Sequence, residues 1–434
     1  MINNAIVCIF IIYLKGIYKG IIMQTIHINL ISEQLIPNLV PTLSDSNCKG
    51  VVLVSGDSTL NDRAERLEYI YSQRGVDVVK HIQGKSSFKL SDIKCQAKEL
   101  IDFLKNNHSD KRWVLNATCG TKPMALTFTS AFNEYNATLS NINDSAFIIY
   151  TDSQNKEIPL LNDGIEFSLP YKSELTIDEI LAANGFMIMS AITKNNDDDI
   201  IKRKDLTEYL SNKLPQDCIG MLAALQAMAT EASKDFPNNK VQSMRKEPIS
   251  TYAQVYNKLD ENGLISWDSD TKTIIFNSED ACRYLAGRWL EEMTYLTALK
   301  CGFEEVAMSV EGVWGDKYDL ANAQKDNRSL KGKNNEFDIL IRTNNQLLTI
   351  ECKARNWSVN SQGVNESTQQ DVMHKLDNLG RKLGGLFGLN VLVSAYSLTP
   401  AMTERAKSNR INVLDNINLD KMRQYLKDLN RKMS

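Results

Sequence analysis

Apolar runs and amphipathic runs alternate along the first third of the chain. Short stretches rich in Val, Ile and Leu predict strands, and longer stretches with apolar residues three and four positions apart predict helices. The expected strands are Thr25–Ile31, Gly50–Ser55, Asp77–His81, Arg112–Asn116 and Ala146–Thr151. The expected helices begin near Pro37 and span Asn61–Ser72, Ser91–Asn106 and Pro123–Tyr135. This alternation predicts an α/β fold with a parallel, doubly wound sheet, whose ligand crevice lies outside the carboxyl ends of the strands.

The pattern changes to short helices between Leu175 and Glu279. Residues Ser250–Gly263 predict an amphipathic helix that ends at a glycine, and Leu264–Trp267 and Thr273–Phe276 predict a hairpin after it. A helix followed by a small hairpin indicates a winged-helix module. The expected helix carries one Lys and no Arg, so it is poor in phosphate contacts, which favours a spacer over a DNA-binding module.

Two apolar-rich runs in the C-terminal part of the chain flank Asn344 and Asn345. Asparagine tolerates the positive φ angle that a two-residue hairpin loop requires. If these two residues form the loop, the flanking strands pair symmetrically about it. Asp338 then lies directly across from Glu351.

The pairing of Asp338 with Glu351 needs a counter-charge, because like charges directly opposite each other destabilise a sheet. Strand alternation also places Lys353 on the same face as Glu351, so two carboxylates and a lysine converge. Carboxylate oxygens hold Mg²⁺ or Mn²⁺, the ion polarises a phosphate and activates water, and a lysine offsets developing negative charge. The group therefore predicts metal-assisted phosphodiester hydrolysis. The alternative is a surface hairpin with a cross-strand network of lysine and carboxylates.

An Asp on one strand and Glu-x-Lys on the next resemble the pattern of the PD-(D/E)xK nuclease superfamily, with Asp338, Glu351 and Lys353 in the matching positions. A helix through Asp371–Lys382 and a strand at Leu389–Ala395 resemble the rest of that fold. The resemblance implies that all three residues are catalytic and that the two acids bind Mn²⁺ or Mg²⁺.

The same superfamily often adds a glutamate from the preceding helix. Here Gly287–Glu292 opens an amphipathic helix whose core face carries Trp289, Met293 and Leu296. The Trp-Leu-Glu order resembles the family motif and favours Glu291 over Glu292 as a further catalytic residue and metal ligand. A solvated helix acid is the alternative.

The segment Asn116–Met124 follows an expected strand and opens an expected helix. Backbone N–H groups at a helix N-terminus, Gly120, two threonine hydroxyls and Lys122 are suited to bind an anion. The segment is not a Walker P-loop, because no glycine stands five residues before Gly120 and Thr121 separates that glycine from the lysine. For this fragment alone, an ordinary turn and helix cap is the alternative.

This segment resembles the N-x-T-G-G-T-K-x-M signature of CARF domains, the Rossmann-like sensors that bind cyclic oligoadenylate second messengers in type III CRISPR defence. Cys119 replaces the first glycine of the Gly-Gly pair. Ser32–Gln34, after the first strand, resembles the opening motif of one CARF subfamily, and Ser55–Thr59 ends the second strand in the same crevice. The expected ligand-binding residues are Ser32, Glu33, Gln34, Ser55, Asp57, Ser58, Thr59, Asn116, Thr118, Gly120, Thr121 and Lys122.

A CARF domain followed by a PD-(D/E)xK domain is the architecture of the second-messenger-activated ancillary CRISPR nucleases. The resemblance implies a homodimer that binds cyclic tetra-adenylate across its CARF pair and then cuts single-stranded RNA and DNA, or nicks duplex DNA, with Mn²⁺ or Mg²⁺. A symmetric ligand on a two-fold axis contacts both subunits equally, and it activates to the extent that it prefers the active arrangement. The messenger ring size, the preferred nucleic acid and base, and degradation of the activator stay open.

Two other functions stay open. One is an oligoadenylate-sensing DNA-binding regulator, whose winged helix reads DNA while its nuclease-like domain is inert. The retained Asp338, Glu351 and Lys353 argue against it. The other is a restriction or repair endonuclease that needs no messenger.

Charge and cysteine content narrow the classes of protein further. The 434 residues carry 50 Lys and Arg against 53 Asp and Glu, so no global basic field indicates a nucleic-acid partner. The charge is uneven, since residues 281–434 are net +4 and residues 1–280 are net −7. Eight cysteines without a Cys-x-x-Cys pair and four isolated histidines argue against a zinc ribbon, a redox dithiol and a histidine-based hydrolase. Scattered cysteines are typical of buried thiols in a reducing cytoplasm.

Residues 1–22 stand apart from the rest. Ala5–Leu14 is a ten-residue apolar run, shorter than the roughly 20 residues that span a bilayer, and Lys15 and Lys19 follow it rather than precede it as in a signal peptide. We interpret this segment as a non-domain extension, with a membrane or export role as the alternative, and expect a cytoplasmic protein without a membrane partner. The expected domains are the extension 1–22, a CARF sensor domain 23–172, a helical, winged-helix-like linker domain 173–280 and a PD-(D/E)xK nuclease domain 281–434.

Overall fold

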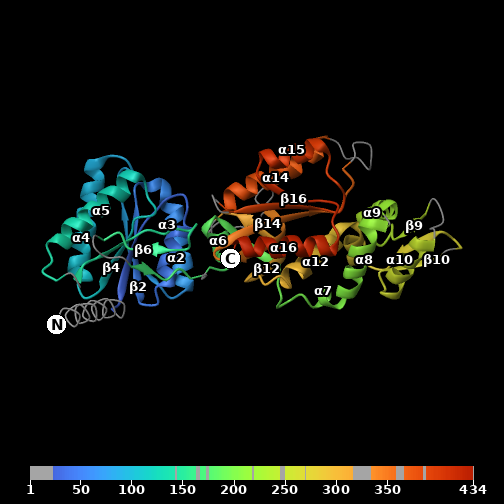
Figure 1. Cartoon of the computed structure of the whole chain (residues 1–434), viewed down its shortest axis with the longest axis horizontal. Helices are drawn as coiled ribbons and strands as arrows, with labels where there is room; N and C mark the ends of the chain where they lie inside the picture. The colour runs from blue at the N-terminus through green and yellow to red at the C-terminus, as the bar shows by residue number, and fades with distance from the viewer. Residues whose placement is uncertain are drawn as a thin grey trace, which may run out of the picture. The chain divides into compact units, whose positions relative to one another are not determined.

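Five parallel strands form the first sheet of the chain in this computed structural model (Figure 1). They are β1 (Thr25–Leu30), β2 (Cys48–Ser55), β3 (Asp77–Gln83), β4 (Arg112–Asn116) and β5 (Phe147–Ile149), in the order β3-β2-β1-β4-β5. The connecting helices are α2 (Ile36–Ser44), α3 (Asn61–Gln73), α4 (Leu90–Asn107) and α5 (Lys122–Ala137), with a short turn of 3₁₀ helix, η1 (Ser58–Leu60). The predicted doubly wound α/β fold is therefore confirmed.

Successive side chains of β1 point to opposite faces of the sheet, so alternate residues pack against different helices. Ile26, Ile28 and Leu30 lie in an apolar core with residues of α4 and α5. The opposite face carries His27 and Asn29, which are fully buried although polar. Their side chains are hydrogen-bonded within the domain, as buried polar groups must be. Figure 1 shows α4 and α5 on one side of the sheet and α2 and α3 on the other.

A small hairpin and a short helix follow the first sheet. They are β6 (Ile158–Pro159), β7 (Ser168–Leu169) and α6 (Ile177–Ala183). The hairpin was not predicted, because strands of two residues are too short to show a period. The helix begins with a capping box in which Thr176 and Glu179 bond each other's backbone N–H groups.

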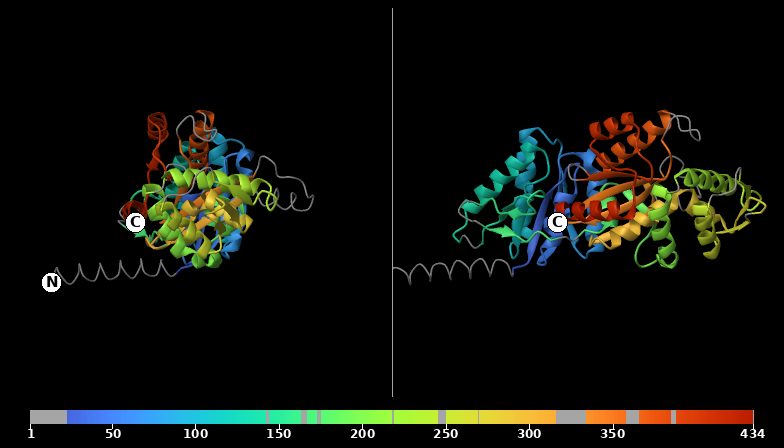
Figure 2. Two further views of the ribbon diagram at one scale, coloured as in Figure 1. Left: turned by 90° about the vertical axis from the view of Figure 1, so that its right-hand side faces the viewer. Right: turned by 45° about the vertical axis from the view of Figure 1, so that its right-hand side comes forward.

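The second sheet has six strands and is mixed. Its strands are β8 (Phe186–Ile192), β12 (Glu305–Trp314), β13 (Asn334–Thr343), β14 (Gln346–Lys353), β15 (Leu389–Ser394) and β16 (Ile411–Leu414), in the order β16-β15-β14-β13-β12-β8. Its helices are α12 (Trp289–Leu299), α14 (Glu366–Gly384), α15 (Pro400–Ser408) and α16 (Leu419–Met433). Figures 1 and 2 show α14 and α15 on one face of this sheet and α12 and α16 on the other. The predicted hairpin, helix and strand of this block are present, and β8, β12 and β16 extend the sheet beyond the prediction.

Between β8 and α12 the chain forms a small helical module with its own three-stranded sheet. Its elements are α7 (Asp198–Lys202), α8 (Lys204–Asp217), α9 (Ile219–Lys234), β9 (Val241–Ser243), α10 (Ser250–Glu261), β10 (Ile265–Asp268), β11 (Thr273–Phe276), α11 (Glu279–Arg283) and the π-helical turn η3 (Tyr284–Arg288). The predicted helix and hairpin correspond to α10, β10 and β11, and β9 adds a strand. Leu222 and Leu225 of α9 belong to the same apolar core as Trp289 and Ile350, so the module shares its core with the second sheet.

The structure describes residues 23–433 except 142–143, 163–166, 173–174, 218, 245–249, 269, 316–333, 358–365 and 385–387. The chain divides into two compact units, of which the first holds residues 1–187 and 315–328 and the second holds residues 188–314 and 329–434. The expected extension 1–22 lies outside the described residues. The four expected domains, with boundaries at 22, 172 and 280, stay a prediction.

Six cysteines lie in the described part of the chain, and all six are free thiols. Five are buried as expected, but Cys95 on α4 is exposed, because it lies on the solvent side of an amphipathic helix. No helix among the described residues is long and apolar enough to cross a membrane.

Candidate functional site

The hairpin that carries the expected catalytic residues has the predicted loop. Asn344 and Asn345 adopt φ angles of 50° and 59°. Thr343 pairs with Gln346, and the symmetric pairing continues to Ile339 and Ile350. The register derived from two asparagines is therefore confirmed.

One position further on, side-chain contacts replace regular strand pairing. Asp338 Oδ2 accepts a hydrogen bond of 2.7 Å from the backbone N–H of Cys352. The Lys353 ammonium lies 3.3 Å from Asp338 Oδ2 and 2.7 Å from Glu351 Oε1. The two acids are 7% and 3% exposed, so the three groups meet at the floor of the site as the sequence predicted for this hairpin.

A second lysine, which the sequence analysis missed, contacts the same group. Lys375 on α14 lies 3.1 Å and 3.0 Å from the two carboxylate oxygens of Glu351. No short-range pattern connects a helix residue 24 positions later with this glutamate. Only the packing of α14 on β14 brings them together.

Burial and charge set the protonation of these groups. Burial alone would raise the pKa of Glu351, but the Lys353 and Lys375 ammonium groups outweigh it and lower the pKa. Burial and the Glu351 charge raise the pKa of Asp338. Burial alone would lower the pKa of Lys353, but the two carboxylates raise it, so the lysine stays charged. The site therefore contains ionised Glu351 and protonated Lys353 at neutral pH.

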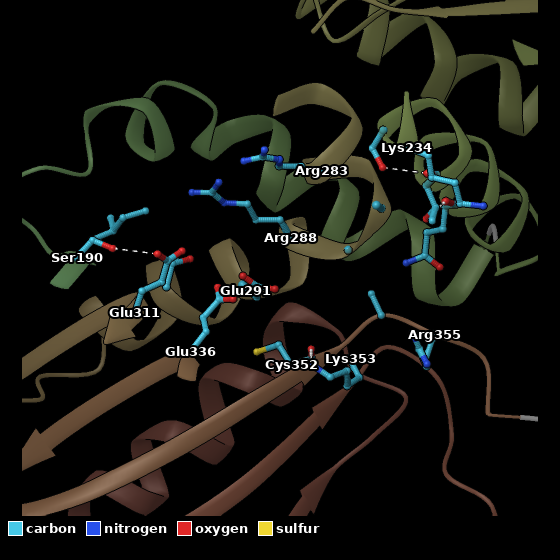
Figure 3. A pocket seen from close by; sticks show the side chains of 18 of the residues that line it. Ser190, Lys234, Arg283, Arg288, Glu291, Glu311, Glu336, Cys352, Lys353 and Arg355 are labelled. Atoms are coloured by element: carbon cyan, nitrogen blue, oxygen red, sulfur yellow. Dashed lines mark hydrogen bonds between the residues drawn. The ribbon is translucent and has the colours of Figure 1, made fainter. Parts of the chain in front are cut away.

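The two consecutive glutamates of α12 have different surroundings. Glu291 lies in a pocket of about 940 Å³ beside Lys353 and Glu336 (Figure 3). Burial, followed by the charge of Asp338, raises the pKa of Glu291 to about 8. Glu292 is fully buried and receives three hydrogen bonds, of 3.1 Å, 2.9 Å and 2.6 Å, from the Arg203 guanidinium. Glu291 thus shares the pocket with Lys353, and Glu292 anchors the helix to the module.

Glu336 is a further acid of this pocket that the sequence analysis did not single out. It precedes Asp338 by two residues on β13 and pairs with Glu311 across β12. Burial and the Asp338 charge raise the pKa of Glu336. Side chains two residues apart on a strand lie on the same face, so the position of Glu336 two residues before Asp338 could have indicated this acid from the sequence.

The oxygen donors of the site fit a hard divalent cation. Asp338, Glu351 and Glu291 are the candidate ligands, because carboxylate oxygens are what Mg²⁺ and Mn²⁺ prefer. Among the described residues, no three acidic, cysteine or histidine side chains are arranged as a ready ligand set. The Lys353 ammonium lies between Asp338 and Glu351, where it supplies the positive charge that these two acids require.

We expect replacement of Arg203 by alanine to lower the free energy of unfolding by about 3–5 kcal/mol, because it removes the hydrogen bonds of the fully buried Glu292 carboxylate and leaves it only the 3.6 Å contact with Arg288. Chemical denaturation measures this loss. The matched control is Lys300→Ala, which removes an ion pair of 2.5 Å to Glu208 between partly exposed groups and should cost less than about 1 kcal/mol. Equal losses in the two variants would contradict the anchoring role of Arg203.

The expected ligand crevice of the first unit lies where the strand order reverses, at the carboxyl ends of β1 and β4. Gly120 adopts a φ angle of +78°, and a Cβ atom there would lie 3.0 Å from the Leu30 Cβ atom. Thr121 caps α5 and accepts a hydrogen bond from the backbone N–H of Met124. The turn and helix N-terminus predicted from the motif are therefore present.

Several expected ligand-binding residues hold the crevice loops together. Asn116 is fully buried, donates to the Pro37 carbonyl at 2.8 Å and accepts from the Thr118 hydroxyl at 2.6 Å. The Ser55 hydroxyl is buried beside a ring nitrogen of His81 at 2.9 Å. These side chains shape the crevice from within.

Asp57 has a similar structural role. It accepts hydrogen bonds from Thr59 and Ser87, which lower the pKa of its carboxyl. Its carboxylate also caps η1. The loop of Ser87, which the motifs did not indicate, is thereby held at the edge of the crevice.

Other expected residues face solvent. Glu33, Gln34, Ser58, Thr59 and Lys122 are exposed, and Ser32 is half-buried. Glu33 forms an ion pair of 2.5 Å with Arg63, a residue that the sequence analysis missed because it lies within α3. Lys122 stands in the first turn of α5, where its ammonium adds to the positive end of the helix dipole.

Taken together, the described residues define a Rossmann-like ligand-binding domain and a nuclease-like effector domain in one chain. A family model of the Card1 CARF domain matches residues 26–179, and a model of the Card1-like endonuclease domain matches residues 278–433. The chain therefore belongs to the CARF-domain ancillary nucleases of CRISPR systems, with both domains of the Card1 type.

Solved structures of similar fold span nearly the whole chain. Protein VC1899 from Vibrio cholerae has a TM-score of 0.76 and 19% sequence identity, over 94% of this chain and 99% of that one. Can2 from Sulfobacillus thermosulfidooxidans, solved in complex with cyclic tetra-adenylate, has a TM-score of 0.69 and 20% identity, over 95% of this chain and 98% of that one. No curated protein matched the chain.

Proposed function

We propose that this chain is a cyclic tetra-adenylate-activated, metal-dependent endonuclease that acts as a homodimer in type III CRISPR antiviral defence. It cleaves single-stranded RNA and DNA, or nicks duplex DNA. The observation that carries the proposal is the convergence of Asp338, Glu351 and Lys353 in a chain that also has a Card1 CARF domain. The complex of Can2 with cyclic tetra-adenylate supports the choice of messenger.

In this proposal, Asp338, Glu351 and Glu291 hold Mn²⁺ or Mg²⁺. The bound ion supplies Lewis-acid polarisation of the phosphate and a more acidic water. Lys353, which stays protonated, offsets the negative charge that develops on the phosphate. Lys375 keeps the Glu351 carboxylate ionised and oriented.

In the sensor domain, the proposal assigns the messenger to the crevice at β1 and β4. The N-terminus of α5, with Thr121 and Lys122, faces its phosphates, and Ser32, Glu33, Gln34, Ser58 and Thr59 line the approach. Gly120 permits close contact with the backbone. Asn116, Thr118, Ser55 and Asp57 act by holding these loops in place.

The direct test incubates the purified protein with labelled single-stranded RNA, single-stranded DNA and supercoiled plasmid in Mn²⁺, with and without cyclic tetra-adenylate. Cleavage that requires both the metal and the messenger is the expected result. Cleavage without the messenger would indicate an endonuclease that is not controlled by the CARF domain. No cleavage with either cyclic tetra- or hexa-adenylate would favour the DNA-binding regulator.

We expect the affinity for Mn²⁺ to rise with pH up to about 8. Glu291 must lose its proton to bind a cation, and its pKa is about 8, so affinity falls by up to about tenfold for each pH unit below that value. Calorimetric titration of the metal-free chain between pH 6 and 9 measures the trend. In the Glu291→Gln variant, the affinity for Mn²⁺ should no longer rise as the pH approaches 8. Affinity that does not change with pH in the wild type would contradict Glu291 as a ligand.

A further inference from the structure

The pocket at the catalytic residues extends well beyond them. It has a volume of about 940 Å³, and all its described lining residues belong to the second unit. One wall comes from strands β12 to β14, which carry Glu311, Glu336 and Lys353. The other wall comes from the helical module, through α9, α11 and η3. The module that the sequence favoured as a spacer therefore forms half of this pocket.

Four cationic side chains besides Lys353 line the pocket. Lys234 ends α9, Arg283 ends α11, Arg288 ends η3, and Arg355 follows β14. Figure 3 shows Arg283 and Arg288 above Glu291, with Lys234 and Arg355 to the right of Lys353. The cations therefore lie on both sides of the catalytic group.

Three of these cations, Lys234, Arg283 and Arg355, are available to a ligand. Lys234 pairs with Glu231 at 2.6 Å and Arg283 pairs with Glu279 at 2.6 Å, but these two cationic side chains are 63% and 62% exposed. Exposed pairs of this kind contribute at most about 1 kcal/mol, so a phosphate can compete with the glutamate. Arg355 is exposed and forms no ion pair with the residues that the structure describes. Arg288 is 25% exposed and pairs with Asp280 and Glu292.

We propose that the groove between the helical module and the sheet binds a single polynucleotide strand, and that Lys234, Arg283 and Arg355 contact its phosphates on either side of the cleaved bond. This inference rests on the proposed nuclease function. It assigns the module a direct part in substrate binding.

The lining points to binding of the backbone rather than of the bases. No Phe, Tyr, Trp or His is found among the described residues that line the groove. Stacking on aromatic side chains is how single-strand-binding proteins usually hold bases, and it is absent from this described lining. Phosphate contacts carry no sequence information, so the groove accepts strands of any sequence.

The depth of the site favours a single strand over a duplex. Lys353 lines the groove, and the two acids that it contacts, Asp338 and Glu351, are only 7% and 3% exposed. Duplex DNA is stiff and costs energy to bend, whereas a single strand bends freely to reach such buried groups.

The test measures binding without cleavage, by fluorescence anisotropy of labelled single-stranded oligonucleotides with the full-length protein in EDTA, with and without cyclic tetra-adenylate. The variants are Lys234→Ala, Arg283→Ala and Arg355→Ala. Loss of one phosphate contact should weaken binding about fivefold at about 0.1 M salt. It should also lower the magnitude of the slope of log binding constant against log salt concentration by about 0.7. Oligonucleotides of different sequence should be affected equally.

The matched control is Lys258→Ala. Lys258 is in the same module and pairs with Glu261 three residues away, as Lys234 pairs with Glu231, but it lies outside the groove. Its replacement should leave binding unchanged. Equal binding by the Lys234→Ala and Lys258→Ala variants, or tighter binding of duplex than of single strands, would overturn the groove assignment.

Failure of this inference can be told from failure of the proposed function. If the wild type cleaves with messenger and metal while the groove variants bind and cleave normally, only the groove assignment is wrong. If the wild type cleaves nothing but the groove variants lose binding, the groove stands and the nuclease proposal fails.

Discussion

Replacement of Glu351 by alanine is expected to lower cleavage in the presence of messenger and Mn²⁺ by at least about a thousandfold. Glu351 is the one carboxylate of the site whose pKa is lowered, so it is ionised and ready to bind a cation at neutral pH. Its loss also leaves the Lys353 ammonium with Asp338 as its remaining carboxylate contact within the site. Rates of cleavage of labelled single-stranded substrates measure the effect.

A second substitution separates chemistry from folding. Glu351→Gln keeps the shape of the side chain and should lose nearly as much activity as the alanine variant, while messenger binding by the CARF domain stays unchanged. Glu261→Gln, at an exposed glutamate of α10 outside the pocket, is the matched control and should cleave like the wild type. Substantial cleavage by Glu351→Gln would rule out this carboxylate as a metal ligand.

The Lys122→Ala variant is expected to lose activation by cyclic tetra-adenylate while it still dimerises. The exposed ammonium lies at the N-terminus of α5, where it and the helix dipole act on the same anion. A charged hydrogen bond contributes about 1.5–3 kcal/mol, so messenger binding should weaken by about 10- to 100-fold. Calorimetry measures binding, and analytical ultracentrifugation measures the oligomeric state.

The control for this variant is Lys98→Ala, because Lys98 is an exposed lysine in the middle of α4 rather than at a helix N-terminus. It should bind the messenger as the wild type does. Activation of Lys122→Ala at wild-type messenger concentrations would place the messenger elsewhere. Cleavage measured without the messenger should be equally low in the wild type and in both variants, since the nuclease residues are untouched.

The hairpin shows how far local pattern extends. Two asparagines specify a tight loop, the loop sets the register, and strand alternation then places Asp338, Glu351 and Lys353 together. Each step depends on neighbouring residues only. For the same reason, the first sheet was predicted strand by strand, because its apolar runs and helical periods are long and distinct.

The crevice motif shows where local pattern does not define the role of each residue. Its residues are near the switch point as predicted, but Asn116, Ser55 and Asp57 use their polar atoms inside the protein. A sequence motif records that a polar residue is needed and does not distinguish binding a ligand from holding a loop. Exposure and hydrogen-bond partners make that distinction, and both depend on the folded chain.

Local sequence patterns were therefore sufficient for the α/β architecture, the hairpin register and the group of two acids and one lysine. Three features required long-range packing: the contact of Lys375 with Glu351, the ion pair of Arg203 with Glu292 that gives Glu292 a different role from Glu291, and the α9 wall of the groove. In each, the partners lie on elements far apart in sequence, and a shared apolar core brings them together. Hydrophobic burial is non-directional, so no spacing in the chain records which distant side chains it will place in contact.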